Sequence, residues 1–273
     1  MTKNNTLAIL LIIISSLLKG QIIENFQPVA KIEYNMILTL NGYQKYKAEL
    51  YYNESAAYYS YKMVNNEETK VLTDQSDEKH NSNTKVELSV NSPFDFILVD
   101  EKNKSIKSSV WDFKNKKIHY IEEDQTKINW QLLDETKLVG DFLCKKAIGK
   151  FKGREYVAWY SPQIDTNFGP MKFGQLPGLI FEISDTQNKF FCQISKVAIP
   201  YTTALDINLD TTPITKAEYN KSLKIYMQEL NDSIKKKMEN TIAKMGGDDV
   251  KVSNINIETN ENKVEQLEIE DAP

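Results

Sequence analysis

The fold is decided by residues 142–161, which read FLCKKAIGKFKGREYVAWYS. Two strand-like runs, 142–151 and 154–161, flank the short turn Lys152-Gly153. β-Branched and aromatic residues in runs of this length are typical of strands, and a two-residue turn containing Gly is typical of a β-hairpin. The stretch therefore predicts an antiparallel hairpin. Its pairing puts four side chains on one face: Cys144, Ile148, Val157 and Trp159.

Similar signals recur on both sides of this hairpin. Residues 179–184 and 189–197 flank a polar turn and predict a second hairpin. One face of it carries Leu179, Phe181, Ile183, Phe190, Cys192 and Ile194. From residue 30 onward, shorter strand-like runs follow each other with turn pairs such as Asn41-Gly42 between them. We therefore expect a mainly β (α+β) domain at residues 21–210, built as a curved antiparallel sheet or half-barrel meander.

A change of period marks residues 211–247. Thr215 and Glu218 have the spacing of a capping box, and apolar residues then recur every three or four positions until Gly246-Gly247. This pattern predicts one long C-terminal amphipathic helix packed on the sheet. The other interpretation of its apolar stripe is a docking surface for a partner or a membrane. Residues 248–273 form an acidic tail.

Residues 1–20 have the pattern of a secretion signal. Lys3 precedes an apolar run from Leu7 to Leu18, which is shorter than the roughly twenty residues of a bilayer span. A signal peptide is therefore favoured over a membrane anchor or a buried helix. We expect an exported chain, periplasmic or extracellular. Because no cysteine directly follows the run, we expect no lipoprotein, and no later segment reaches transmembrane length.

Composition and charge limit the classes of molecule that the chain is expected to bind. The 273-residue chain has a formal net charge of −4 and no basic stripe, so nucleic acid is not an expected partner. Its two cysteines, Cys144 and Cys192, both follow the secretion signal. In an oxidising compartment they could form a disulfide, and the alternative is two separate buried thiols.

A second informative segment is residues 169–180, which read GPMKFGQLPGLI. Within it, Leu176-Pro177-Gly178-Leu179 predicts a type II turn. The long loop 162–178 contains Phe168, Met171, Phe173 and Leu176, which either cover the core, the favoured interpretation, or line a pocket. Arg154 either binds an anion or, more commonly for such a position, pairs with a cross-strand acid.

Together with the first hairpin, this segment resembles the GLPGLI family, which comprises secreted proteins of Bacteroidetes-type bacteria. The resemblance rests on Cys144, Gly153, Arg154, Trp159, Tyr160, Gly169, Pro170, Phe173, Gly174, Leu176, Pro177, Gly178, Leu179 and Ile180. Gln175 stands where the first glycine of the family's hexapeptide is expected. The resemblance implies export, an envelope setting and a β-rich fold, and it implies no assigned activity and no catalytic residues.

No catalytic constellation is visible in the sequence. The two histidines, His80 and His119, are far apart, and no zinc, nucleophile or nucleotide-binding motif is present. We therefore expect a non-enzymatic envelope protein without cofactor or metal, which binds a protein partner or a small apolar ligand. Two alternatives stay open: a lipid or lipoprotein carrier with a hollow half-barrel, and an enzyme of unrecognised type.

Overall fold

The computed structural model describes residues 22–39, 43–64, 71–73, 84–87, 95–208, 213–244 and 257–258. The predicted secretion signal, His80 and nearly all of the acidic tail lie outside these residues.

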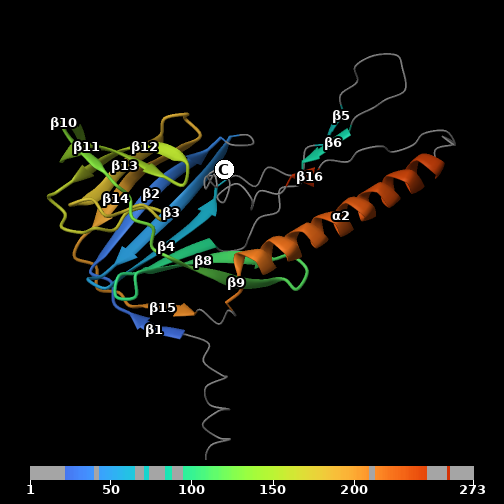
Figure 1. The fold of residues 1–273 in the computed structure, drawn as a ribbon, viewed down its shortest axis with the longest axis horizontal. Coiled ribbons are helices and arrows are strands. Elements are labelled where there is room, and N and C mark those ends of the chain that lie inside the picture. The colour runs from blue at the N-terminus through green and yellow to red at the C-terminus, as the bar shows by residue number, and fades with distance from the viewer. Residues whose placement is uncertain are drawn as a thin grey trace, which may run out of the picture.

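One antiparallel sheet of eleven strands dominates the structure (Figure 1). In chain order its strands are β2 (Ala30–Leu38), β3 (Gln44–Tyr52), β4 (Ala56–Met63), β7 (Asp95–Asp100), β8 (Ser105–Asp112), β9 (Lys117–Asp124), β10 (Gln131–Val139), β11 (Phe142–Phe151), β12 (Arg154–Ser161), β13 (Leu179–Asp185) and β14 (Phe190–Ala198). Their order in space is β10-β11-β12-β13-β14-β2-β3-β4-β7-β8-β9. The predicted mainly β fold with a curved antiparallel sheet is confirmed.

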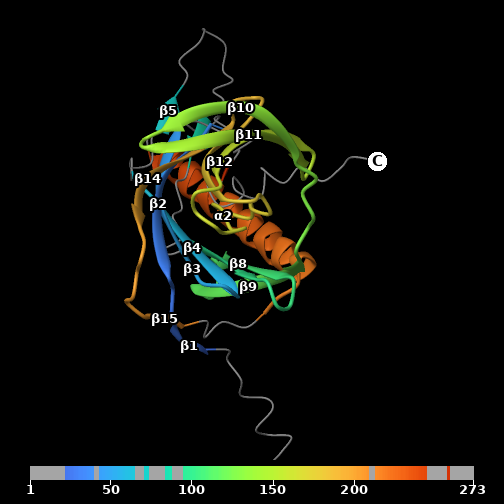
Figure 2. The same cartoon turned by 90° about the vertical axis from the view of Figure 1, so that its left-hand side faces the viewer.

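Strands that follow each other in this way would form a closed barrel if the first and last strands of the sheet also paired, but they do not. Strands β9 and β10 follow each other in the chain, yet they form the two opposite edges of the sheet. We call the unmade pairing between them the seam. The sheet curls, so that β10 and β11 face β8 and β9 across its interior (Figure 2). Residues 125–130, which we call the strap, connect the two edges.

The remaining elements lie around this sheet. β1 (Ile22–Phe26) pairs with β15 (Leu205–Asn208), a contact between distant segments that the sequence did not predict. A small three-stranded sheet contains β5 (Val71–Thr73), β6 (Thr84–Glu87) and β16 (Ile257–Glu258). The C-terminal helix α2 spans Lys216–Lys244.

The core lies on the inner face of the curled sheet. In β2, alternate residues from Ala30 to Leu38 are buried, as a strand with one covered face requires. Tyr34, Tyr59, Tyr156, Phe181 and Phe190 are among the largest fully buried side chains. The Tyr34 hydroxyl donates a hydrogen bond to the carbonyl of Ile180 at 2.8 Å, which satisfies a polar group deep in this core.

The first hairpin has the predicted register, with Ile148 opposite Val157. The more buried face of β12, however, is the other one, which carries Tyr156, Ala158 and Tyr160. Trp159 is half-buried because two lysines cover it: the Lys137 Nζ lies 4.5 Å from the ring centroid and the Lys146 Nζ 5.8 Å. Both ammonium groups lie over the ring as cation–π partners, and each is also paired with a carboxylate, Glu182 at 2.6 Å and Glu135 at 2.9 Å.

The predicted C-terminal helix is confirmed, but only its first turns pack on the sheet. The Thr215 hydroxyl accepts a hydrogen bond from the Glu218 amide, and Glu218 accepts one from the Thr215 amide, so the capping box forms. Tyr219 and Leu223 are buried against Val110 of β8. Beyond them α2 extends away from the sheet (Figure 1). Among the described residues, no helix has the length and apolarity that a membrane span needs.

Of the two interpretations of Cys144 and Cys192, the structure supports two separate buried thiols and does not support the disulfide. Both side chains are buried free thiols. Cys144 lies on β11 and Cys192 on β14, and two strands separate them. Three strand spacings amount to about 14 Å, whereas a disulfide needs Cα atoms within roughly 7 Å. Compartment and an even cysteine count carry no information about this separation.

We expect the unfolded chain to take up two alkyl groups without any reductant, as measured by intact mass spectrometry. In the folded chain alkylation should be slow, because burial raises the pKa of Cys144 to about 11 and that of Cys192 further, and the thiolate is the reactive species. A denatured chain that reacts only after reduction would contradict this.

Candidate functional site

The loop of residues 162–178 fills the interior of the curled sheet. Ile164, Phe168, Met171, Phe173 and Leu176 are all buried and belong to the main core. The Phe173 ring packs against Tyr156 and Phe190, with centroids 4.6 and 5.6 Å apart. The loop therefore covers the core, and the hollow interior that a half-barrel carrier would need is occupied by the chain's own side chains.

Hydrogen bonds fasten this loop to the strap. The indole Nε1 of Trp130 donates to the carbonyl of Gly174 at 2.9 Å. The Gln175 side chain makes two more bonds: its Oε1 accepts from the Ile128 amide at 3.0 Å, and its Nε2 donates to the Thr126 carbonyl at 2.9 Å. The loop is thus tied to the segment that crosses the seam.

The glycines of the motif are required by close backbone approach. At Gly178, φ is +142°, and a Cβ there would lie 2.3 Å from the Ser161 carbonyl oxygen. The predicted type II turn is not formed in its usual way, because the Leu179 amide donates to Ile164 rather than to Leu176. Gln175 has φ +64°, a left-handed conformation that favours glycine. Its two side-chain bonds offset that strain.

We expect Gln175→Ala to destabilise the chain more than Gln175→Gly. Both variants lose two side-chain bonds, worth about 1–3 kcal/mol together. Only alanine keeps the left-handed strain, so the glycine variant should be more stable than the alanine variant by about 1 kcal/mol. Urea unfolding of both variants measures the difference. Equal midpoints would show that the backbone at 175 carries no strain.

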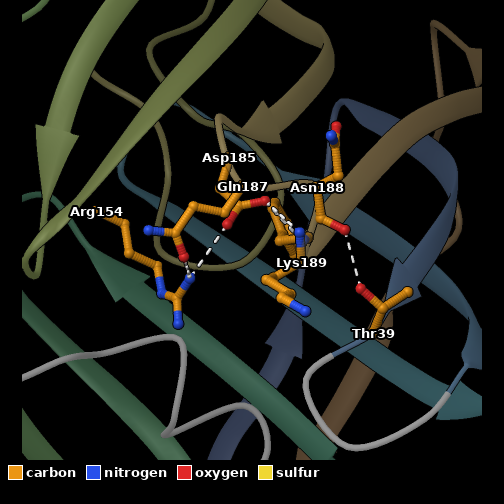
Figure 3. A network of polar contacts seen from close by, with 7 residues as sticks. Thr39, Arg154, Asp185, Gln187, Asn188 and Lys189 are labelled. Carbon is orange, nitrogen blue, oxygen red and sulfur yellow. Dashed lines mark hydrogen bonds and ion pairs between the residues drawn. The ribbon is translucent and has the colours of Figure 1, made fainter.

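A buried polar network joins the tips of the two hairpins (Figure 3). The Arg154 Nη1 lies 3.1 Å from Asp185 Oδ2 and donates to Gln187 Oε1 at 3.2 Å. The other oxygen of Asp185 accepts from the amides of Lys189 and Phe190 at 2.7 and 2.8 Å. The side chains of Arg154 and Asp185 are 7% and 1% exposed.

This geometry settles the two interpretations of Arg154 in favour of the cross-strand pair. The carboxylate of Asp185 accepts three hydrogen bonds, so the arginine's charge is balanced within the fold. Arg154 pairs with Asp185, whereas His119 lies on β9 with its Nε2 3.6 Å from Asp112 Oδ2. The structure therefore does not bring these two residues together as a site.

We expect Asp185→Asn to cost about 3–5 kcal/mol of unfolding free energy, because it leaves the buried Arg154 charge unbalanced. A matched control is Glu135→Gln. The Glu135 side chain is 60% exposed, and its carboxylate lies 2.9 Å from the Lys146 ammonium. That change should cost less than about 1 kcal/mol. Chemical denaturation compares them, and similar costs would contradict the buried pair's role.

A cleft of about 890 Å³ lies where the β10–β11 turn, the start of the loop and β14 meet. We call it the end cleft. Its apolar and aromatic lining includes Val29, Tyr52, Phe142, Phe181, Ile194 and Ile199. Its polar lining includes Asp141, Gln163, Asp165, Gln193, Ser195 and Lys196. A concave site with aromatic walls and a few polar groups is the usual form of a ligand site.

Several lining side chains are held in place by the fold. The rings of Phe142 and Phe181 pack with centroids 4.7 Å apart. Gln163 Oε1 accepts from the Leu143 amide and the Ser161 hydroxyl. Burial, and then the charge of Asp165, raise the pKa of Tyr52 to about 12, so its hydroxyl stays protonated at neutral pH. The two rings form a fixed apolar wall, and the Gln163 amide and the Tyr52 hydroxyl are preorganised polar groups.

The motif residues identified from the sequence do not line the end cleft. Most are buried: Cys144, Arg154, Tyr160, Gly169, Pro170, Phe173, Gly174, Leu176, Gly178, Leu179, Ile180 and Cys192. Trp159 is half-buried, and Gly153 and Pro177 are exposed at turns. The cleft residues were missed because they come from six separate segments that share no motif. In the described part of the chain, no three His, Cys, Asp or Glu side chains are placed to hold a metal ion.

The comparisons with known proteins correct the family. A family model described as "N-glycanase peptide, N-terminal domain" matches residues 51–216, more than half of the chain. The chain belongs to this family. The predicted GLPGLI membership, and with it the GLPGLI-type envelope function, is therefore wrong. The residues that suggested it are core and turn residues of the N-glycanase peptide N-terminal domain fold, and packing motifs of this kind do not identify a function.

Solved structures with some likeness to this chain are two crystal forms of PNGF-II. The form in space group C2 has 14% identity and a TM-score of 0.47, and the match covers 72% of this chain and 32% of that chain. The form in P21 has 14% identity and a TM-score of 0.48, with 71% and 33% covered. The chain thus spans about a third of the length of these structures. No curated protein matches it.

Proposed function

We propose that this chain binds the glycans of glycoproteins in the end cleft and does not cleave them. The description of the family names an N-glycanase, and this name supports glycans as the ligand class. The observation that carries the proposal is the lining of the cleft. The lining combines aromatic residues, such as Tyr52 and Phe142, with hydrogen-bonding side chains, such as Asp165 and Gln193.

The chemistry of a sugar fits such a lining. A pyranose ring has apolar C–H faces, which pack on aromatic rings, and a rim of hydroxyls, which donate and accept hydrogen bonds. The carboxylates of Asp141 and Asp165 are acceptors, the Tyr52 hydroxyl and the Lys196 ammonium are donors, and amide groups serve as both. The volume of about 890 Å³ lies within the range of small-molecule sites and is large enough for more than one sugar unit.

The non-catalytic part of the proposal rests on the sequence, which has no recognisable catalytic constellation. We also propose that the chain is exported, because residues 1–20 have the pattern of a secretion signal. An exported chain encounters glycoproteins outside the cytoplasm.

We expect a glycoprotein bearing N-glycans to bind the chain, and the same protein stripped of glycans to bind at least about tenfold more weakly. Ser195→Trp, which places a large ring at the exposed lining of the cleft, should abolish this preference. Ser233→Trp on the exposed side of α2 is the matched control and should leave it unchanged. Surface plasmon resonance measures both. Equal binding of the two glycoprotein forms would overturn the proposal.

The same glycoprotein tests the non-catalytic part. After prolonged incubation with the chain, its intact mass should be unchanged, because binding alone breaks no bond. Release of glycan from the glycoprotein would show that the chain is an enzyme. The Ser195→Trp variant would still test whether the end cleft is the site.

A further inference from the structure

A second and smaller pocket lies between the β8–β9 hairpin and the first turns of α2. Its volume is about 300 Å³, and it shares no residue with the end cleft. Four of its lining residues are aromatic: Trp111, Phe113, Tyr219 and Tyr226. Phe113 and Tyr226 stack on each other, with centroids 4.9 Å apart and an interplanar angle of 16°, so this wall is rigid. We call this site the aromatic pocket.

The polar lining of the aromatic pocket is acidic. Among the described residues that line it, Asp112 and Glu218 are carboxylates, and none is lysine or arginine. The nearby Lys114 points its ammonium toward Glu229, 3.6 Å away. The lining therefore carries two carboxylates, and the imidazole of His119 lies beside Asp112.

Both carboxylates are fixed and ionised. Asp112 Oδ1 accepts from the amides of Lys114 and Asn115, and its Oδ2 accepts from the side-chain amide of Asn115. These bonds hold the pKa of Asp112 below its usual value, and the capping bonds with Thr215 do the same for Glu218. Fixed negative charges beside aromatic rings create a potential that attracts a cation even where every carboxylate oxygen already has a partner.

We propose that the aromatic pocket binds a small organic cation, such as a quaternary or primary ammonium group. Such a ligand combines a positive charge, which the two carboxylates and the ring faces attract, with an apolar body, which the rings bury. A hydrated metal ion is a poorer fit, because the walls are mainly carbon. The pocket's size of about 300 Å³ suits a ligand of a few heavy atoms.

The test compares choline with 3,3-dimethyl-1-butanol, a neutral molecule of nearly the same shape, on the full chain. Saturation-transfer NMR and quenching of tryptophan fluorescence measure binding at constant ionic strength. We expect choline to bind at least about tenfold more tightly than the neutral molecule. Equal binding, or a choline dissociation constant above about 10 mM, would overturn the proposal.

Variants locate the site. Trp111→Leu should weaken choline binding at least about fivefold, whereas Trp159→Leu, which removes a tryptophan from the other part of the sheet, should not. Asp112→Asn should also weaken it, and Glu155→Gln is the control for net charge, because Glu155 is exposed and outside the pocket. Unchanged binding by Trp111→Leu and Asp112→Asn would overturn the assignment. If either variant misfolds by circular dichroism, the comparison of choline with its neutral counterpart still decides.

Discussion

Strands β9 and β10 are neighbours in the chain but opposite edges of an eleven-stranded sheet, so the apolar interior between them has to be covered by something other than a strand. A curled sheet of this kind buries one face only if the chain supplies the filling. Here the loop 162–178 supplies it, with Phe173 among the rings of Tyr156 and Phe190. The strap then crosses the seam, and Trp130 and Gln175 fix it to the loop by three hydrogen bonds. The deeply buried Tyr34 is compatible with this arrangement because its hydroxyl reaches the carbonyl of Ile180.

The buried pair of Arg154 and Asp185 has a different role. Replacing a buried ion pair by apolar residues is often neutral or stabilising, so such a pair is weak evidence for stability in itself. What it specifies is geometry, because the Arg154 Nη1 and the Asp185 carboxylate have to meet across the two hairpin tips. Asp185 caps the β13–β14 turn through two backbone amides while it holds the arginine of the adjacent hairpin tip. The two hairpins are therefore locked in one relative position at the same end.

The strands of the hairpins could be predicted because the period of two and the turn residues are local signals. The burial of Phe168, Phe173 and Leu176 followed from their apolar character in a long loop. The pairing of the cysteines could not be predicted, because it depends on how many strands lie between β11 and β14. Trp159 was expected on the apolar face of its hairpin, and its partial exposure depends on lysines from β10 and β11. The end cleft was invisible in the sequence, since Tyr52, Asp165 and Ser195 meet only after folding. The resemblance to the GLPGLI family was misleading because the motif glycines are required by close backbone packing. Proteins of unrelated function can have the same packing.

Because the chain's own side chains fill the interior, the end cleft lies at one end of that interior, where core residues such as Tyr52 and Phe181 form part of its lining. A carrier with a hollow barrel would offer one enclosed apolar cavity, whereas this fold leaves concave sites where elements meet at its margins. The end cleft forms where a turn, the loop and β14 converge, and it combines acids, amides and one lysine with aromatic rings. The aromatic pocket forms where α2 meets the β8–β9 hairpin, and its lining carries the carboxylates of Asp112 and Glu218. Because the two sites share no lining residue, substitutions in one should not alter the other, and the free energies of their effects should add.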